Sequence, residues 1–248
     1  MVHKRTPAVV LDILDHGESD NIVTFYSPLV GKISGIAKGA KRSKKRFVNK
    51  LELFSWLELF YDDRGSGSLV RISEAELRDS FISIRTDYER YVAAALINEL
   101  VLYWTRENDA DPELFAMLVW AYQGLHRGED PVRTVILFQV KLIDIMGYRP
   151  HLAGCISCGA FDSAGSPFGF SLGRSGLVCR TCNGDNGGHI PVSLSTAKLL
   201  CSAQELPREK LGRLRFSDAS AREAVVLLKR YGQQLLHRDV QSWNFLRI

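Results

Sequence analysis

Four of the five cysteines form two closely spaced pairs, with the pattern C-x2-C-x20-C-x2-C. The first pair is Cys155 and Cys158, and the second is Cys179 and Cys182. Each pair places two thiolates on one tight turn, and the intervening loop can bring the turns together around a tetrahedral Zn²⁺ ion. Four thiolates leave no open coordination position. The spacing therefore predicts a structural zinc ion rather than a catalytic one.

The segment around these cysteines reads as a small knuckle over residues 151–190. Residues 168–171 and 176–178 have the pattern of a hairpin between the two pairs, and glycines follow each pair. His151 and His189 could each replace a cysteine as a ligand, although we interpret both as surface residues. The fifth cysteine, Cys201, lies among apolar residues and is interpreted as a small buried hydrophobe. Because the segment is poor in apolar residues, a metal would supply stability that a core cannot.

A second group of residues suited to binding is cationic. Residues 38–46 hold six cations in nine positions. Residues 1–50 as a whole hold ten Lys or Arg against four Asp or Glu, whereas residues 51–248 hold 22 against 24. This asymmetry favours a local surface for an anionic partner. Nucleic acid is the leading candidate for that partner, and the candidate nucleic-acid-binding residues are Lys32, Lys38, Lys41, Arg42, Lys44, Lys45 and Arg46.

Charge alone leaves alternatives open at this loop. Runs of like charge are commonly solvated loops, and such a run can also bind an acidic protein segment. Nearby aromatic residues would offer stacking surfaces for bases, but aromatic residues are more often part of a core. These aromatics are Phe47, Phe54, Trp56 and Tyr61.

The elements that position both groups differ along the chain. Residues 1–80 contain five β-rich stretches, at 8–14, 21–26, 31–39, 51–61 and 69–72, separated by glycine-containing turns. Short strands of this kind predict a small barrel of the OB type, although the number of strands alone does not exclude an SH3-like barrel.

Residues 81–248 have a helical period. Helices are expected at 88–104, 112–125, 131–146, 193–204 and 218–237. Asp130 and Pro131 form an N-cap followed by a proline in the first turn, and the helix that they begin is apolar over most of its surface. We therefore expect this helix at the centre of the core. The predicted fold is α+β, with a barrel domain at 1–80 and an α-helical domain at 81–248 that carries the inserted knuckle.

The sequence also argues against other classes of protein. No apolar run approaches the ~20 residues that a membrane span needs, and the N-terminus has no apolar signal-peptide core. We therefore expect a cytoplasmic protein whose thiols stay reduced. The chain has no phosphate-binding G-x-x-x-x-G-K-[ST] loop and no nucleophile elbow. Four carboxylates between residues 12 and 20 are expected to be scattered by strand alternation, so we expect no enzymatic activity.

Several blocks of the sequence together resemble one known family. They are residues 16–24, residues 31–44, Tyr148-Arg149-Pro150 before the cysteine pairs, and residues 236–246 near the C-terminus. In this order they are similar to the blocks of the RecO family of bacterial recombination mediators. The resemblance extends over the whole chain.

The resemblance implies an OB barrel packed on a helical region with an inserted zinc knuckle. It implies binding of single- and double-stranded DNA, annealing of complementary strands, and work with RecR and the single-strand-binding protein in loading RecA. It also implies a nucleoid-associated location. The basic stretch matches the DNA-binding part of the family block, and the four cysteines match the zinc ligands of members that keep the knuckle. The alternative is a zinc-stabilised docking adaptor whose basic loop binds an acidic protein partner.

Overall fold

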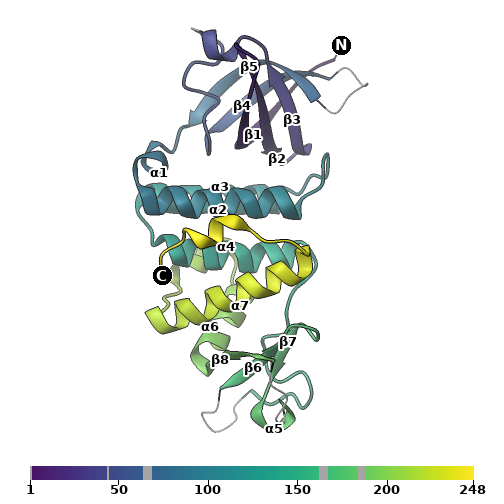
Figure 1. The fold of residues 1–248 in the computed structure, drawn as a ribbon, viewed down its shortest axis with the longest axis vertical. Helices are drawn as coiled ribbons and strands as arrows, with labels where there is room; N and C mark the ends of the chain where they lie inside the picture. The colour runs from purple at the N-terminus through teal and green to yellow at the C-terminus, as the bar shows by residue number, and fades with distance from the viewer. Residues whose placement is uncertain (1, 44, 64–68, 162–166, 184–187) are drawn as a thin grey trace. The chain divides into compact units, whose positions relative to one another are not determined.

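The computed structural model describes residues 2–43, 45–63, 69–161, 167–183 and 188–248 (Figure 1). The chain divides into two units, residues 1–128 and residues 129–248. Each unit has its own buried apolar side chains. The sequence analysis predicts a domain boundary after residue 80, between the barrel and the helical domain, and this boundary stays a prediction.

The first unit begins with a closed barrel. Its strands follow the order β1-β2-β3-β5-β4, and β4 pairs with β1 to close the circle. Strands β3 and β5 are parallel, whereas the other neighbours are antiparallel. This is the topology of an OB-type barrel, so the predicted fold class is confirmed. The strands are β1 (Val2–His16), β2 (Asp20–Ser27), β3 (Gly31–Ala37), β4 (Trp56–Asp63) and β5 (Leu69–Asp79).

The segment between β3 and β4 differs from the prediction, which begins a strand at residue 51. Residues 51–55 form turns, and Phe54 adopts a left-handed backbone conformation with φ 71°. The backbone N–H of Phe54 donates to the carbonyl oxygen of Val10 at 3.1 Å. The apolar run misleads the prediction because Leu51 and Phe54 are buried from a loop rather than from a strand. Phe47 and Tyr61 are also buried, so these aromatic side chains belong to the core.

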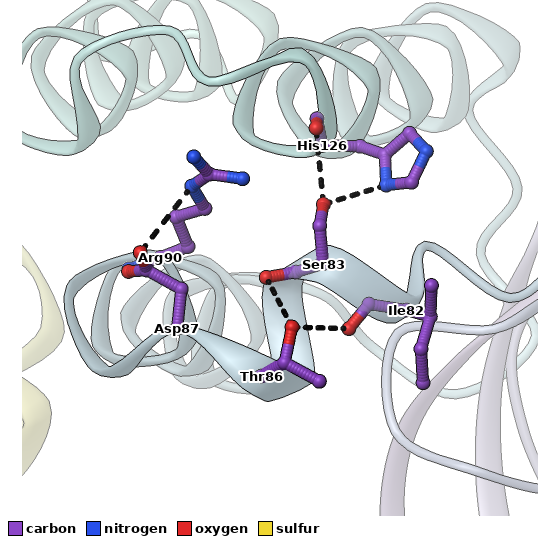
Figure 2. Close-up of polar contacts among 6 residues, drawn as sticks. All are labelled: Ile82, Ser83, Thr86, Asp87, Arg90 and His126. Atoms are coloured by element: carbon purple, nitrogen blue, oxygen red, sulfur yellow. Dashed lines mark hydrogen bonds and ion pairs between the residues drawn. The ribbon is translucent and has the colours of Figure 1, made fainter.

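Three helices complete the first unit: α1 (Ile82–Thr86), α2 (Tyr88–Trp104) and α3 (Pro112–Arg127). Figure 2 shows how α1 is joined to α3: the hydroxyl of Ser83 donates to the carbonyl oxygen of His126 at 3.0 Å and lies 2.7 Å from Nδ1 of that histidine. Asp87 caps α2, because its carboxylate accepts the backbone N–H of Arg90 at 3.0 Å. The chain thus turns from barrel to helices through a short, well-bonded connection.

A buried amide links the barrel to the helices of this unit. Asn98 on α2 is 4% exposed, and its Nδ2 donates to the carbonyl oxygen of Leu11 on β1 at 2.7 Å. Its Oδ1 accepts a hydrogen bond from the hydroxyl of Tyr122 on α3. One side chain therefore holds three elements in fixed positions.

The second unit is built around α4 (Pro131–Ile145), as the sequence predicts. Asp130 caps this helix, and its residues from Thr134 to Ile143 are all buried. Helices α6 (Leu194–Glu205) and α7 (Asp218–Leu236) pack against it. Two polar side chains inside this core donate to backbone carbonyl oxygens: Lys141 Nζ donates to that of Gln204 at 2.7 Å, and Gln139 Nε2 donates to that of Leu228 at 3.1 Å. Short 3₁₀ helices η2 (Arg208–Arg213) and η3 (Gln241–Asn244) flank α7.

The remaining strands of this unit lie within and directly after the predicted knuckle at residues 151–190. Strands β6 (Phe168–Ser171), β7 (Gly176–Val178) and β8 (Ile190–Val192) form an antiparallel sheet in the order β7-β6-β8. The pairing of β6 with β7 confirms the predicted hairpin. Phe170 on this sheet meets Tyr231 of α7 edge to face, with ring centroids 5.3 Å apart. Within the described part of the chain, no helix combines the length and apolar character that crossing a membrane requires.

The turn between β2 and β3 generates the first prediction. Gly31 has φ +70°, and a Cβ on it would lie 2.2 Å from the carbonyl oxygen of Asp109. Gly39 has nearly the same φ, +68°, but a Cβ there would meet nothing within 4 Å. Gly39→Ala should cost about 1–2 kcal/mol for the left-handed conformation alone. Gly31→Ala should cost clearly more, because backbone must also move. Urea unfolding of both variants measures the difference, and equal losses would contradict the predicted steric contact.

Candidate metal centre and nucleic-acid interface

The two cysteine pairs meet at one end of the small sheet. Cys155 and Cys158 lie on a turn that precedes β6, Cys179 follows β7 directly, and Cys182 lies on the short helix α5 (Arg180–Asn183). Backbone hydrogen bonds shape the first turn: the N–H of Gly159 donates to the carbonyl oxygen of Cys155 at 2.8 Å. The second turn closes similarly, from Cys182 N–H to the carbonyl oxygen of Cys179 at 3.1 Å.

The sulfur geometry fits a tetrahedral metal ion. All four Sγ atoms lie within 4.8 Å of one another, and those of Cys158 and Cys179 are 3.8 Å apart. Four thiolates at about 2.3 Å from a Zn²⁺ ion are themselves about 3.8 Å apart. The cluster is therefore placed to hold a metal ion, and its all-sulfur donor set suits a soft or borderline cation.

The thiols of the cluster perturb one another. Burial raises the pKa of Cys155, but backbone N–H groups of Cys179, Ser157 and Cys158 outweigh burial and bring that pKa down to about 6. Hydrogen bonds with the thiols of Cys179 and Cys158 raise the pKa of Cys182 to about 12. Four sulfurs this close cannot all carry negative charge unless a cation lies among them, because like charges disfavour ionisation. The remaining cysteine, Cys201, lies outside the cluster and is half-buried.

The cationic loop follows β3 and begins with the 3₁₀ turn η1 (Ala40–Arg42). Asp20 anchors its entry, because its carboxylate accepts the backbone N–H of Gly39 at 2.8 Å. That bond, with a second one from the Ser19 hydroxyl, lowers the pKa of Asp20. Phe47 anchors the exit, since its ring is 4% exposed inside the barrel.

Five of the predicted DNA-binding side chains lie along this anchored loop, and all five residues are exposed: Lys38, Lys41, Arg42, Lys45 and Arg46. The guanidinium of Arg46 lies 5.1 Å from the ring centroid of Phe47, at a cation–π distance. Lys44, also predicted as a DNA contact, lies outside the described residues. The structure thus gathers these five cations on one loop at the barrel.

Lys32 lies apart from the other predicted contacts. Its Nζ donates to the carbonyl oxygens of Leu102 at 2.8 Å and Thr105 at 2.6 Å, at the C-terminal end of α2. Burial lowers the pKa of Lys32, and the carboxylate of Glu107 partly offsets that effect. An ammonium at this position satisfies carbonyl groups that the helix leaves without partners and complements the helix dipole. Its predicted DNA contact stays a prediction, and the geometry adds a structural role.

Sequence reasoning missed two acidic residues that lie beside the cationic loop. Asp15, near the end of β1, and Glu18, on the turn between β1 and β2, approach Lys41 and Arg42 of the loop. The sequence predicts that the carboxylates between residues 12 and 20 are scattered, and their proximity to the loop arises only when β3 brings the loop back beside the hairpin. The register of β1 on β2, with His16 opposite Asp20, places the hairpin tip at residues 17–19.

The fold and the site together define the class of protein. It is a protein with an OB-type barrel followed by helices, and a four-cysteine knuckle is inserted among those helices. Comparison with known families gives the same answer. The family model for the recombination protein O N terminal matches residues 1–81, and that for the recombination protein O C terminal matches residues 85–244. The chain belongs to the RecO family.

Curated relatives match over nearly the whole chain. DNA repair protein RecO of Syntrophobacter fumaroxidans is 36% identical over 212 residues, which cover 86% of this chain and 84% of the relative. DNA repair protein RecO of Syntrophus aciditrophicus is 31% identical over 98% of this chain and 94% of its own length. DNA repair protein RecO of Roseiflexus sp. is 33% identical over 98% of this chain and 84% of its own length.

The contacts of Lys32 generate the second prediction. Lys32→Met keeps the aliphatic stem but leaves two carbonyl oxygens without their donor, so it should lower the free energy of unfolding by about 1–3 kcal/mol. Lys38→Met, at an exposed position, should change it by less than about 0.5 kcal/mol. Chemical denaturation measures both. If Lys32→Met instead leaves stability unchanged and weakens binding to an oligonucleotide, the lysine acts as a DNA contact and not as a structural link.

Proposed function

We propose that this chain is a DNA repair and recombination mediator without catalytic chemistry. In this role it binds single- and double-stranded DNA, anneals complementary strands and, together with RecR, helps load RecA onto DNA coated with single-strand-binding protein. The observation that carries the proposal is the exposed cationic loop on an OB-type barrel in a RecO chain. Its relatives bear the name DNA repair protein.

The physics of annealing suits such a loop. Two complementary strands repel each other through their phosphates, so a protein that neutralises phosphates on one surface lowers the barrier to their meeting without breaking a bond. Asp20 anchors the loop at Gly39, and Phe47 anchors its exit, so the described cations between these points, Lys41, Arg42, Lys45 and Arg46, are held at the barrel surface. We propose residues 1–80 as the DNA-binding domain and residues 81–248 as the helical domain with the knuckle inserted at 151–190.

The annealing activity is tested with two complementary oligonucleotides, each coated with single-strand-binding protein, and duplex formation is followed by fluorescence. The chain should accelerate annealing without any nucleotide cofactor. A variant with five loop cations changed to Ala, at Lys41, Arg42, Lys44, Lys45 and Arg46, should lose this acceleration. Five cations that were unpaired in the free protein and all met phosphates would give a log–log salt slope of about −3.5 for a single strand.

A matched control separates the loop from charge in general. The second unit has its own cationic cluster at η2 and just beyond, with Arg208, Lys210, Arg213 and Arg215 all outside the knuckle. Changing these four residues to Ala removes comparable charge and should leave annealing largely intact. An equal loss in both variants would contradict a contact restricted to the barrel loop. No acceleration by folded wild-type protein at low salt would contradict annealing by this chain.

A second candidate function is a docking adaptor whose loop binds an acidic protein segment. One observation favours it: Lys41 and Arg42 already have carboxylate neighbours within the chain, which shows that this loop accommodates acidic groups. Under this hypothesis the five-residue Ala variant keeps its affinity for oligonucleotides and loses an acidic protein partner. Oligonucleotide binding by the variant therefore distinguishes the two functions.

We also propose that the cluster of Cys155, Cys158, Cys179 and Cys182 holds a structural zinc ion. The sulfur spacing and the all-thiolate donor set support this assignment. Such an ion would tie the two turns of the knuckle together, and four protein ligands would leave it no open position for chemistry. The ion would therefore stabilise the fold rather than take part in a reaction.

The zinc proposal is the basis of a further prediction. Elemental analysis of purified protein should find about one zinc per chain, and Cys158→Ser with Cys182→Ser should abolish it. A strong chelator should lower the thermal unfolding temperature of the wild type, because metal binding contributes to folding free energy. Cys201→Ser is the control, since this cysteine lies outside the cluster, and it should keep the metal. Undiminished zinc in the double variant would contradict the assignment.

A further inference from the structure

The turn between β1 and β2 is docked against the cationic loop through backbone groups. The N–H of Lys41 donates to the carbonyl oxygen of Ser19 at 3.0 Å, and the N–H of Gly39 donates to the carboxylate of Asp20 at 2.8 Å. These bonds fix the start of the loop beside the hairpin tip. The side chains of both segments must therefore share one small region of surface.

Two carboxylates of the hairpin lie beside two cations of the loop. Lys41 Nζ is 3.2 Å from Asp15 Oδ1 and also donates to the carbonyl oxygen of Gly17 at 3.1 Å. Arg42 Nη2 is 3.7 Å from Glu18 Oε2. The side chains of Asp15 and Glu18 are 81% and 95% exposed, and those of Lys41 and Arg42 are 29% and 73% exposed, so solvent reaches both pairs. Exposed ion pairs contribute little to stability, so the fold does not depend on them.

We propose that Asp15 and Glu18 act as internal competitors for phosphate at Lys41 and Arg42, and so set the affinity of the loop for DNA. The inference rests on the proposed DNA-binding function. Both carboxylates lie beside their cations at solvent-exposed positions, where a phosphate oxygen would compete with them. Competition with phosphate needs no further residue, because each carboxylate already lies beside its cation.

The competition has a physical signature. When DNA binds a free cation, condensed counterions leave the DNA, and this release drives binding at low salt. When a phosphate displaces a carboxylate, one ion pair replaces another and the freed carboxylate gains counterions of its own. The two occupied cations therefore contribute little to the salt dependence. The wild-type slope should fall short of the value for five free cations by about 1.4, which is about 0.7 for each of two contacts.

This arrangement suits a protein that must release what it holds. Annealing requires two strands to shift against each other until their sequences align, and a strand held by every cation of the loop would shift slowly. Carboxylates that return to Lys41 and Arg42 whenever a phosphate leaves would shorten each contact. Removing the carboxylates should therefore tighten binding and slow dissociation.

The test compares the wild type with a double variant that carries both Asp15→Asn and Glu18→Gln. Binding to a fluorescent oligothymidylate is measured between 50 and 200 mM salt. The slope of the double variant should be steeper by about 1.4, so its affinity should fall about sevenfold further over this range. Its dissociation at low salt, followed by stopped flow, should be slower. Asp12→Asn is the control, because Asp12 is on the same strand and, among the described residues, makes no ion pair with a loop cation.

The outcomes are distinct. A steeper slope and slower release in the double variant alone support the inference. Slopes and rates equal to those of Asp12→Asn, in a protein whose binding still requires the loop cations, would overturn it while leaving the proposed function in place. Absence of salt-dependent binding in the wild type would instead reject the proposed function, and this inference with it.

Discussion

The buried amide of Asn98 fixes the first unit, because it bonds to the barrel and to a neighbouring helix at once. Its Nδ2 donates to Leu11 of β1, and its Oδ1 accepts from Tyr122 of α3. A buried polar group without partners costs about 1–3 kcal/mol, so the amide is stable there only when both partners are in place. Lys32 adds a second link from β3 to the end of α2. These polar contacts require one arrangement of barrel and helices, which apolar packing alone would specify less exactly.

Local chemistry made much of this fold predictable. The caps at Asp111 and Asp130, each followed by proline, begin helices where the sequence indicates them. The cysteine spacing predicted a cluster that the structure brings within 4.8 Å. Helix caps are predictable because they act between residues close in sequence. The cysteine spacing is predictable because it is highly specific to metal ligands. The identity of the metal and the DNA contacts stay predictions, because they concern partners outside the chain.

The rest depended on contacts between distant residues. Lys32 meets groups 70 and 73 positions away, and nothing in its neighbourhood in sequence distinguishes it from the exposed lysines that follow it. The run from Leu51 to Tyr61 contains buried residues throughout much of its length, but only the part from Trp56 onward pairs as a strand. Likewise Asp15 and Glu18 became part of the candidate interface only through the register of three strands.

The cysteine cluster is asymmetric in its exposure to solvent, and this has a kinetic consequence. Cys155 and Cys179 are 1% and 2% exposed, whereas Cys158 and Cys182 are exposed. An incoming ligand reaches the cluster from the side of the two outer sulfurs, while the two inner ones stay in the protein interior. In a cluster that held an ion, Cys155 and Cys179 would be shielded ligands and Cys158 and Cys182 would be the ligands that a competing chelator meets first. The rate of metal exchange would then depend on the competing ligand as well as on the affinity of the site.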